Sequence, residues 1–268
     1  MQPIYWLLFL IVVVFGIGAF WCFERYSIRV KQYTVCLNNL PANFSGLTIL
    51  HLSDLHSKQF GRRQTKLVRL INQQKYDLVA LTGDFVNKFK PDIKPMIDLI
   101  NQLNKVPVYF VPGNHERKTG FQARESLNAA GVRILDNKAV RMVKNGQCLW
   151  IIGVDDPHLG KACLNAALEQ VDDSAPKILL AHSPNIYPEA IEKRLDLVLA
   201  GHTHGGQVRL PLIGALIAPG QGLFPQWDYG LYQKGQTTMI INGGLGESDL
   251  PVRFNIKPEI GLVKLLPA

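Results

Sequence analysis

The sequence predicts an α/β domain that follows a single membrane-spanning helix. One observation is an uncharged, strongly apolar run from Ile4 to Phe23. The other is that short apolar runs alternate with longer helical stretches over most of the remaining chain, a pattern typical of sheets covered by helices. With 268 residues, of which 47% are hydrophobic and 19% charged, the chain is large and apolar enough to form a packed core.

The apolar run at the start of the chain has the length of a membrane span. Its 20 residues would form a helix of about 30 Å, the thickness of the hydrocarbon core of a bilayer. Aromatic residues lie at both ends, as at membrane interfaces. A cleaved signal peptide is the alternative, but no basic residue precedes the run and no small-x-small cleavage site precedes Glu24. We therefore expect residues 1–26 to be a membrane anchor and residues 27–268 to be one domain.

The charges that flank the anchor predict its orientation. Arg25, Arg29 and Lys31 follow the apolar run, whereas no Lys or Arg precedes it. Under the positive-inside tendency, this places the domain on the cytoplasmic side of the cell membrane, behind a single-pass N-terminal anchor.

The elements expected after the anchor alternate between strands and helices. The expected strands are 27–37, 47–52, 78–82, 106–111, 149–154, 178–181 and 195–200. The expected helices are 62–74, 93–103, 122–130, 163–170 and 186–194. From Gln207 onward, Gly, Pro and short strands at 237–241, 252–256 and 262–265 replace the helices, which predicts a second, more antiparallel sheet.

The net charge and the cysteine spacing favour some classes of function and exclude others. A formal net charge of +8 favours anionic partners such as phosphates, nucleic acid or a membrane surface. The chain contains no helix-turn-helix, RNP or aromatic-interleaved basic motif, so nucleic acid is not an expected partner. The four cysteines form no CxxC pair, which excludes a cysteine zinc finger.

Polar, metal-binding residue types follow five of the expected strands. These residues are Asp54 and His56, Asp84, Asn114 with His115 and Glu116, His182, and His202 with His204. Ligands of open α/β sheets collect beyond the carboxyl ends of strands, and residues two apart in an extended chain face the same side. We therefore expect these side chains to meet in one site. His51 and His158 match none of these blocks, and we expect both to be structural.

The residue types in these blocks suit hard or borderline divalent cations. Carboxylates, imidazoles and a carboxamide oxygen, without a thiolate, favour Mn, Zn, Fe(II) or Mg. Seven candidate ligands are too many for one four-coordinate ion and suit two ions with a bridging carboxylate. The candidates are Asp54, His56, Asp84, Asn114, His182, His202 and His204.

The ordered blocks DxH, GD, GNH[DE], a lone His and GHxH resemble the calcineurin-like metallophosphoesterases. The resemblance implies a four-layer αββα sandwich, a catalytic domain over residues 27–268 and a site with two divalent ions, Mn first among them. By position, one ion would be held by Asp54, His56 and His204, and the other by Asn114, His182 and His202. Asp84 would bridge the two ions, His115 would protonate or stabilise the leaving group, and Glu116 would orient His115.

Two cations in such a site would attract a phosphate and lower the pKa of a water that bridges them. The expected reaction is in-line attack on phosphorus by this bridging hydroxide, with general-acid help from His115.

The substrate is predicted less directly. The segment 208–231 follows the last ligands and is unusually apolar, so it could form the wall of a lipid site or pack on the second sheet. Segments 201–211 and 242–253 resemble bacterial membrane-associated phosphoesterases, some of which cleave UDP-2,3-diacylglucosamine in lipid A synthesis. We therefore expect an amphiphilic phosphate substrate at the lipid bilayer. The alternatives are a phosphodiesterase or phosphatase acting on soluble nucleotides or phosphoproteins, and a non-catalytic binding module.

Overall fold

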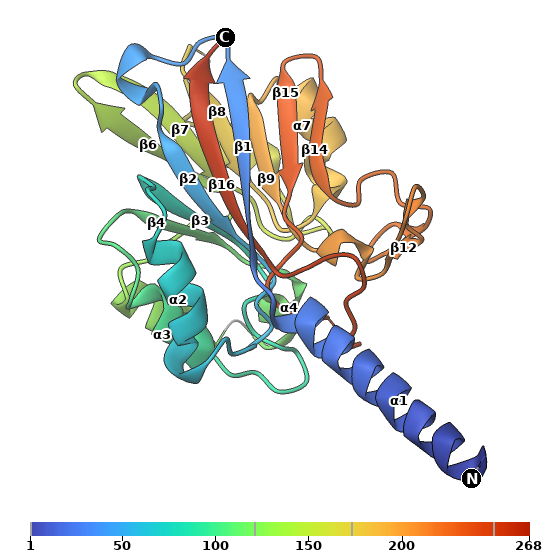
Figure 1. The fold of residues 1–268 in the computed structure, drawn as a ribbon. Helices are drawn as coiled ribbons and strands as arrows, with labels where there is room; N and C mark the ends of the chain where they lie inside the picture. Colours follow the sequence, from blue (N-terminus) through green and yellow to red (C-terminus); the bar gives the residue numbers. More distant parts are fainter. Residues whose placement is uncertain (1, 121, 173, 249) are drawn as a thin grey trace.

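Two six-stranded sheets pack face to face, and helices cover the outer face of each (Figure 1). The computed structural model describes residues 2–120, 122–172, 174–248 and 250–268. The four layers, helix, sheet, sheet and helix, confirm the predicted fold class. Most strands and helices of the layers occupy the runs that the sequence indicated, with boundaries that differ by one to three residues in most cases. The strands β5 (Arg133–Ile134), β6 (Lys138–Lys144) and β14 (Gly230–Lys234) are additions to the expected set.

The N-terminal apolar run forms one long helix, α1 (Gln2–Tyr26). It projects away from both sheets (Figure 1). Among the described residues it is the one helix long and apolar enough to cross a membrane, and none of its apolar window is buried inside the domain. At 25 residues it would span about 38 Å. Length, composition and exposure make α1 a candidate membrane anchor.

The first sheet has the order β1-β16-β2-β3-β4-β5. Its strands are β1 (Arg29–Leu37), β16 (Glu259–Pro267), β2 (Thr48–Leu52), β3 (Leu78–Thr82), β4 (Val108–Val111) and β5 (Arg133–Ile134). All pairs are parallel except β16 with β2. The carboxyl ends of β2, β3 and β4 therefore meet at the same edge of the sheet.

The second sheet has the order β14-β15-β9-β8-β7-β6. Its strands are β14 (Gly230–Lys234), β15 (Thr237–Ile241), β9 (Leu197–Ala200), β8 (Lys177–Leu180), β7 (Gln147–Gly153) and β6 (Lys138–Lys144). The outer pairs are antiparallel and the inner pairs parallel. As a result, the carboxyl ends of β8 and β9 also share an edge.

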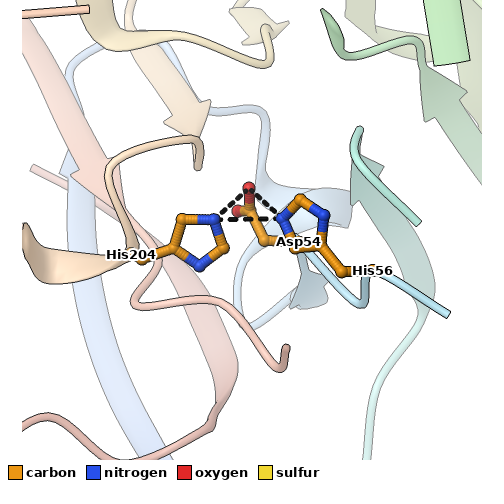
Figure 2. Close-up of side chains that lie close together, drawn as sticks. All are labelled: Asp54, His56 and His204. Atoms are coloured by element: carbon orange, nitrogen blue, oxygen red, sulfur yellow. Dashed lines mark hydrogen bonds and ion pairs between the residues drawn. The ribbon is translucent and has the colours of Figure 1, made fainter. Parts of the chain in front are cut away.

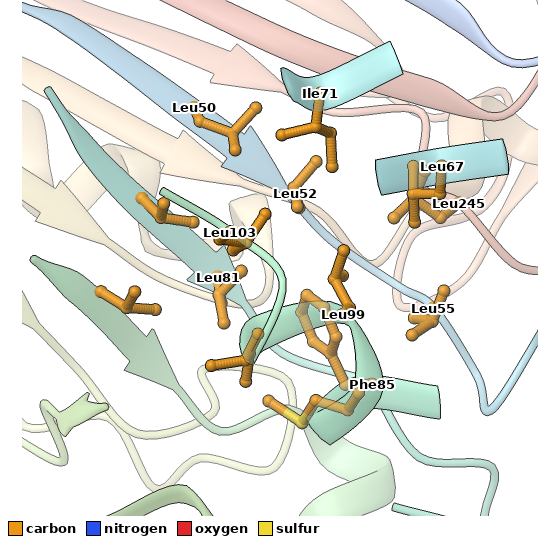
Figure 3. Packing of buried hydrophobic residues seen from close by; sticks show 14 of the residues in the cluster. Leu50, Leu52, Leu55, Leu67, Ile71, Leu81, Phe85, Leu99, Leu103 and Leu245 are labelled. Atoms are coloured by element: carbon orange, nitrogen blue, oxygen red, sulfur yellow. The ribbon is translucent and has the colours of Figure 1, made fainter. Parts of the chain in front are cut away.

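Three apolar clusters hold the layers together. The first packs α2 (Thr65–Asn72), α3 (Lys94–Ile100) and α5 (Arg124–Ala129) against the first sheet, through residues such as Leu67, Leu81 and Leu99 (Figure 3). The second fills the space between the sheets. The third lies under α6 (Leu164–Leu168) and α7 (Tyr187–Glu192) on the outer face of the second sheet.

The second sheet is more antiparallel than the first, as expected, but the C-terminal strands do not all belong to it. Strands β14 and β15 extend the second sheet, whereas β16 lies inside the first. The burial of β16 explains its place, because Ile260 and Leu262 contact the helix side while Val263 and Leu265 contact the other sheet. A strand that is apolar on both faces is stabilised at the centre of a sandwich rather than in a sheet with one solvated face.

The expected strand at 252–256 is also not formed. Within this segment only Phe254 makes a strand-type contact, an isolated bridge to Val208. Instead of pairing with a neighbouring strand, the carbonyl oxygen of Ile256 accepts a hydrogen bond at 3.3 Å from the buried guanidinium of Arg253.

Candidate metal centre

All seven predicted ligands lie where the carboxyl ends of the two sheets meet. Asp54 and His56 follow β2, Asp84 follows β3, and Asn114 begins α4 (Asn114–Lys118), which follows β4. The remaining three come from the second sheet: His182 after β8, and His202 and His204 after β9, the latter in the short helix η4 (His204–Gly206). Each of the seven is almost completely buried.

The backbone at this edge is bent into an uncommon conformation. Five of the seven candidate ligands have positive φ angles, namely Asp54, His56, Asp84, His202 and His204, with values between 49° and 71°. The left-handed region is disfavoured for residues with a Cβ, and non-glycine residues held in it concentrate at functional sites. These turns direct the side chains inward from the strand ends.

Two glycines allow the loops to approach one another closely. A Cβ on Gly113 would lie 2.3 Å from the Asp84 carboxylate, and a Cβ on Gly201 would lie 1.9 Å from the Ser53 hydroxyl. Neither distance is possible for a real carbon atom, so only glycine allows these loops to converge on one centre.

The first cluster of side chains consists of Asp54, His56 and His204 (Figure 2). The two imidazole Nε2 atoms lie 3.0 Å apart. The Asp54 Oδ1 atom is 3.5 Å from His204 Nε2 and 3.9 Å from His56 Nε2. Figure 2 shows the three side chains pointing toward a common space from two different sheets.

The second cluster consists of Asn114, His182 and His202, with Asp84 between it and the first. His182 Nε2 lies 3.2 Å from Asn114 Oδ1 and 3.0 Å from His202 Nδ1. The Asp84 Oδ2 atom is 3.3 Å from His182 Nε2 and 3.9 Å from His56 Nε2. One carboxylate oxygen thus faces both clusters, which is the place required of a bridging ligand.

Burial and mutual proximity fix the protonation of these groups. Burial lowers the pKa of His56 to about 3 and holds those of His202 and His204 well below the usual range, so these rings are neutral near pH 7. Burial also acts against a charged His182, but the nearby carboxylates, Asp84 first, raise its pKa well above its ordinary value. The same pairing holds the pKa of Asp84 well below its ordinary value, although burial alone would raise it.

The donor set fits cations. Ligand atoms that each lie about 2.1 Å from one ion are separated from one another by about 3 to 3.5 Å, the range of most distances in both clusters. The neutral imidazoles of His56 and His204, whose Nε2 atoms face each other at 3.0 Å, also need a positive charge between them to be stable beside each other. The residues present can therefore hold two divalent cations, one in each cluster.

Comparison with known proteins agrees with this geometry. The profile described as calcineurin-like phosphoesterase matches residues 47–206. The metallophosphoesterase YkuE of Bacillus subtilis is 33% identical over 263 residues, covering 93% of this chain and 90% of its own. This chain belongs to the calcineurin-like phosphoesterase family.

Two further relatives have informative names. The phosphodiesterase YaeI of Escherichia coli is 30% identical, over 84% of each chain. A transmembrane protein with a metallophosphoesterase domain from Danio rerio is 28% identical, over 90% of this chain and 58% of its own. Membership in this dinuclear metal-dependent family makes the chain a phosphoester hydrolase, and the clusters described above are candidate metal sites.

In this phosphoesterase His115 lies directly beside the two clusters. Its Nε2 atom is 3.7 Å from Asp84 Oδ2, and its ring is in edge contact with that of His56. Its Nδ1 atom accepts a hydrogen bond from the backbone N–H of Lys88 at 3.1 Å. An accepting Nδ1 leaves the proton of a neutral ring on Nε2, the nitrogen that faces the centre.

The expectation that Glu116 orients His115 is corrected by the structure. The hydrogen bonds described for the Glu116 carboxylate come from the backbone N–H groups of Asp84, Phe85, Val86 and Gly113, at 2.8 to 3.1 Å. A carboxylate at this position can satisfy four converging donors, and it thereby fixes the loop that carries Asp84. Glu116 acts on the backbone rather than on the imidazole.

Two residues near the centre were not expected to belong to it. His158, expected to be structural, has its ring centroid 4.7 Å from that of His202. Arg253 is completely buried, and its guanidinium donates to the carbonyl oxygens of Gly243 and Gly244 at 3.0 and 3.1 Å. Neither residue belongs to one of the sequence blocks that indicated metal ligands. The bonds from Arg253 to backbone carbonyl groups could not be predicted, because any residue can supply a backbone carbonyl.

Proposed function

We propose that this chain is a membrane-anchored phosphoesterase that hydrolyses a phosphodiester or pyrophosphate bond in a lipid-linked substrate such as UDP-2,3-diacylglucosamine. Residues 27–268 form its catalytic domain, on the cytoplasmic side of the membrane. The observation that carries the proposal is that a complete dinuclear donor set and a candidate membrane helix occur in one chain.

The side chains divide between the two ions according to the clusters. Asp54, His56 and His204 hold one ion, and Asn114, His182 and His202 hold the other. Asp84 contributes to both, because its Oδ2 atom faces a histidine of each cluster. Mn is the first candidate for the ions, with Zn, Fe and Mg as alternatives, since all four suit imidazole and carboxylate ligands. When bound, the two ions supply Lewis acidity toward the phosphoryl oxygens and lower the pKa of a coordinated water.

His115 is the proton donor in this proposal. The Lys88 backbone N–H occupies Nδ1, so the Nε2–H group is the one available to the centre. From there it can donate its proton to the leaving oxygen, a contribution typically worth about 10² to 10⁴ in rate. Asp84 accepts a hydrogen bond from the His115 backbone N–H at 2.8 Å, which fixes the distance between the donor and the centre.

Several features support a lipid-linked substrate over a soluble one. The part of α1 up to Phe23 is uncharged and would hold the domain at a bilayer surface. Exposed apolar side chains, including Leu212 and Phe224, lie in the segment that follows the last ligands. The names of the two relatives, a phosphodiesterase and a transmembrane protein, fit the same combination.

The test compares substrates and metals for the full chain purified in detergent. Two equivalents of transition metal per chain and chelator-sensitive hydrolysis of bis-p-nitrophenyl phosphate are expected, with faster turnover of UDP-2,3-diacylglucosamine than of a soluble nucleotide diester or a phosphoprotein. Equal rates on soluble nucleotide diesters after deletion of residues 4–23 would contradict the lipid-linked substrate. A chain that binds no transition metal and shows no chelator-sensitive activity would instead be a binding module.

A further inference from the structure

An apolar cavity of about 580 Å³ lies beside the metal centre. Its walls come from three segments, 206–208, 216–219 and the group Ser248, Leu250 and Val252. Most of the side chains that line it are apolar. Its size is within the range of about 300 to 1,000 Å³ that is usual for small-molecule sites.

One end of the cavity adjoins the metal centre. The wall segment 206–208 begins two residues after His204, a ligand of the first cluster. The opposite wall ends at Pro219, and a Cβ on the next residue, Gly220, would lie 3.2 Å from His202 Nε2. Two walls of the cavity therefore lie next to the phosphate-binding edge.

The other side of the cavity is held by the last turns of α1. The indole N–H of Trp21 donates to the carbonyl oxygen of Pro251 at 3.1 Å, next to the cavity wall. The ring of Phe20 lies 6.0 Å from that of Phe254 in edge contact. The cavity wall is thus attached to the part of α1 that would leave the bilayer, so the cavity opens close to the membrane surface.

The surface around the opening is apolar. Four of the large apolar side chains that line the cavity are exposed at the surface, namely Val208, Ile217, Leu250 and Val252. Such a group on a water-soluble surface usually marks a contact with a protein or a membrane. Its continuity with α1 selects the membrane. The amine of Lys257 lies at the same end of α1, 4.3 Å from the centre of the Phe23 ring, where anionic headgroups would be.

We propose that this cavity binds an acyl chain of the phosphate-bearing lipid and admits it directly from the bilayer beside α1. The proposal rests on the proposed function and adds the place of the lipid tail. It also gives a role to the segment 206–224. The two β-hairpins of this segment form the rim over which the acyl chain leaves the membrane. These are the strands β10 (Arg209–Leu210), β11 (Gly214–Ala215), β12 (Ile217–Ala218) and β13 (Gly222–Leu223).

The test is photolabelling of the full chain in vesicles of phosphatidylethanolamine and phosphatidylglycerol. The probe is phosphatidic acid with a diazirine near the end of one acyl chain, and labelled peptides are mapped by mass spectrometry. We expect label on 206–219 and 250–252. Ile217→Glu places a carboxylate in the lining at an exposed position and should reduce this label at least about tenfold, because a charge is costly to bury beside an acyl chain.

A second variant and a control keep the result interpretable. Val208→Glu, on the opposite wall, should have the same effect as Ile217→Glu. Val143→Glu, an exposed position on β6 outside the cavity, should leave the labelling unchanged. Label confined to α1, or equal label in Ile217→Glu, would overturn the acyl-chain site. Hydrolysis of bis-p-nitrophenyl phosphate by the same preparation separates the two proposals. Label in the cavity without hydrolysis would contradict the proposed function only. Hydrolysis without label in the cavity would contradict the acyl-chain site only.

Discussion

Asp84 and Glu116 hold each other's loops through reciprocal backbone contacts. The Asp84 backbone N–H donates to Glu116 Oε2 at 2.8 Å, while Asp84 Oδ1 accepts from the N–H of His115 at the same distance. Two carboxylates thus bind the turn after β3 to the start of α4. The bridging position of Asp84 depends on this pair of contacts, since the turn has the left-handed conformation that few residues adopt without support.

Glu116→Gln should weaken metal binding without removing a ligand. An amide offers one acceptor oxygen where the carboxylate offers two. Some of the four backbone N–H groups that bond Glu116 would therefore lose their acceptor. We expect metal affinity to fall about 10- to 100-fold, the usual effect of changing a residue that orients a ligand. Chelator competition followed by metal analysis measures this. Glu125→Gln, at an exposed position on α5, is the matched control, and equal affinities in both variants would disprove the role.

His115→Ala should retain both ions and lose most of its turnover. The ring lies within reach of Asp84 and His56, but neither proposed set of ligands includes it, so metal content should stay at two per chain. The loss of a general acid predicts a kcat lower by about 10² to 10⁴. A substrate with a good leaving group, such as a p-nitrophenyl ester, should show a smaller loss than one with an alkyl leaving group. Equal losses on both substrates would argue against proton donation.

His204→Ala should remove one ion and leave the other. Its Nε2 atom faces only the first cluster, with His56 at 3.0 Å and Asp54 at 3.5 Å. We expect about one metal per chain and almost complete loss of hydrolysis, because phosphoryl oxygens are then contacted from one side only. Metal analysis after dialysis checks the count. Retention of two ions would place the first site elsewhere.

The sequence was sufficient for the fold class and for the set of converging residues, because both depend on local patterns. Buried strands are apolar runs, and ligands that follow them are visible as DxH or GHxH. The partners of Glu116, the contact between His115 and Lys88, and the burial of Arg253 could not be predicted. They arise from contacts between segments 10 to 30 residues or more apart, where a backbone amide or carbonyl is the partner and any residue could supply it. The prediction of a strand at 252–256 is wrong for the same reason, because the side chain of Arg253 in this segment bonds backbone carbonyl groups.

His51 should make the folded chain less stable as pH falls. Burial lowers its pKa to about 3, and its Nε2 atom lies 2.9 Å from the Thr82 hydroxyl. Between pH 6.5 and about 3 the unfolded chain binds a proton at this residue that the folded chain does not, so its contribution to stability is complete above pH 6.5 and is lost as pH falls through this window. His51→Gln, which can keep the bond to Thr82, should flatten the slope by up to about 1.4 kcal/mol per pH unit. Denaturant titrations with a chelator at several pH values measure the difference, and parallel slopes would contradict it.

The attachment of α1 to the catalytic domain depends on a buried carboxylate. Glu247 Oε1 accepts from Lys58 Nζ at 2.6 Å and from Arg25 Nε at 3.2 Å, and Lys58 also donates to the Arg25 carbonyl oxygen at 2.6 Å. The side chains of Lys58 and Glu247 are less than 10% exposed, so removing the negative charge leaves cations without compensation. Glu247→Gln should therefore destabilise the chain by about 3 kcal/mol.

Replacing both partners separates charge loss from packing loss at this attachment. Lys58→Met combined with Glu247→Gln should recover part of the stability lost in Glu247→Gln alone, because the buried amine is then gone as well. Unfolding in detergent, followed by the fluorescence of Trp21 and the other tryptophans, gives the free energies. Additive effects of the two substitutions would show that Lys58 and Glu247 do not interact.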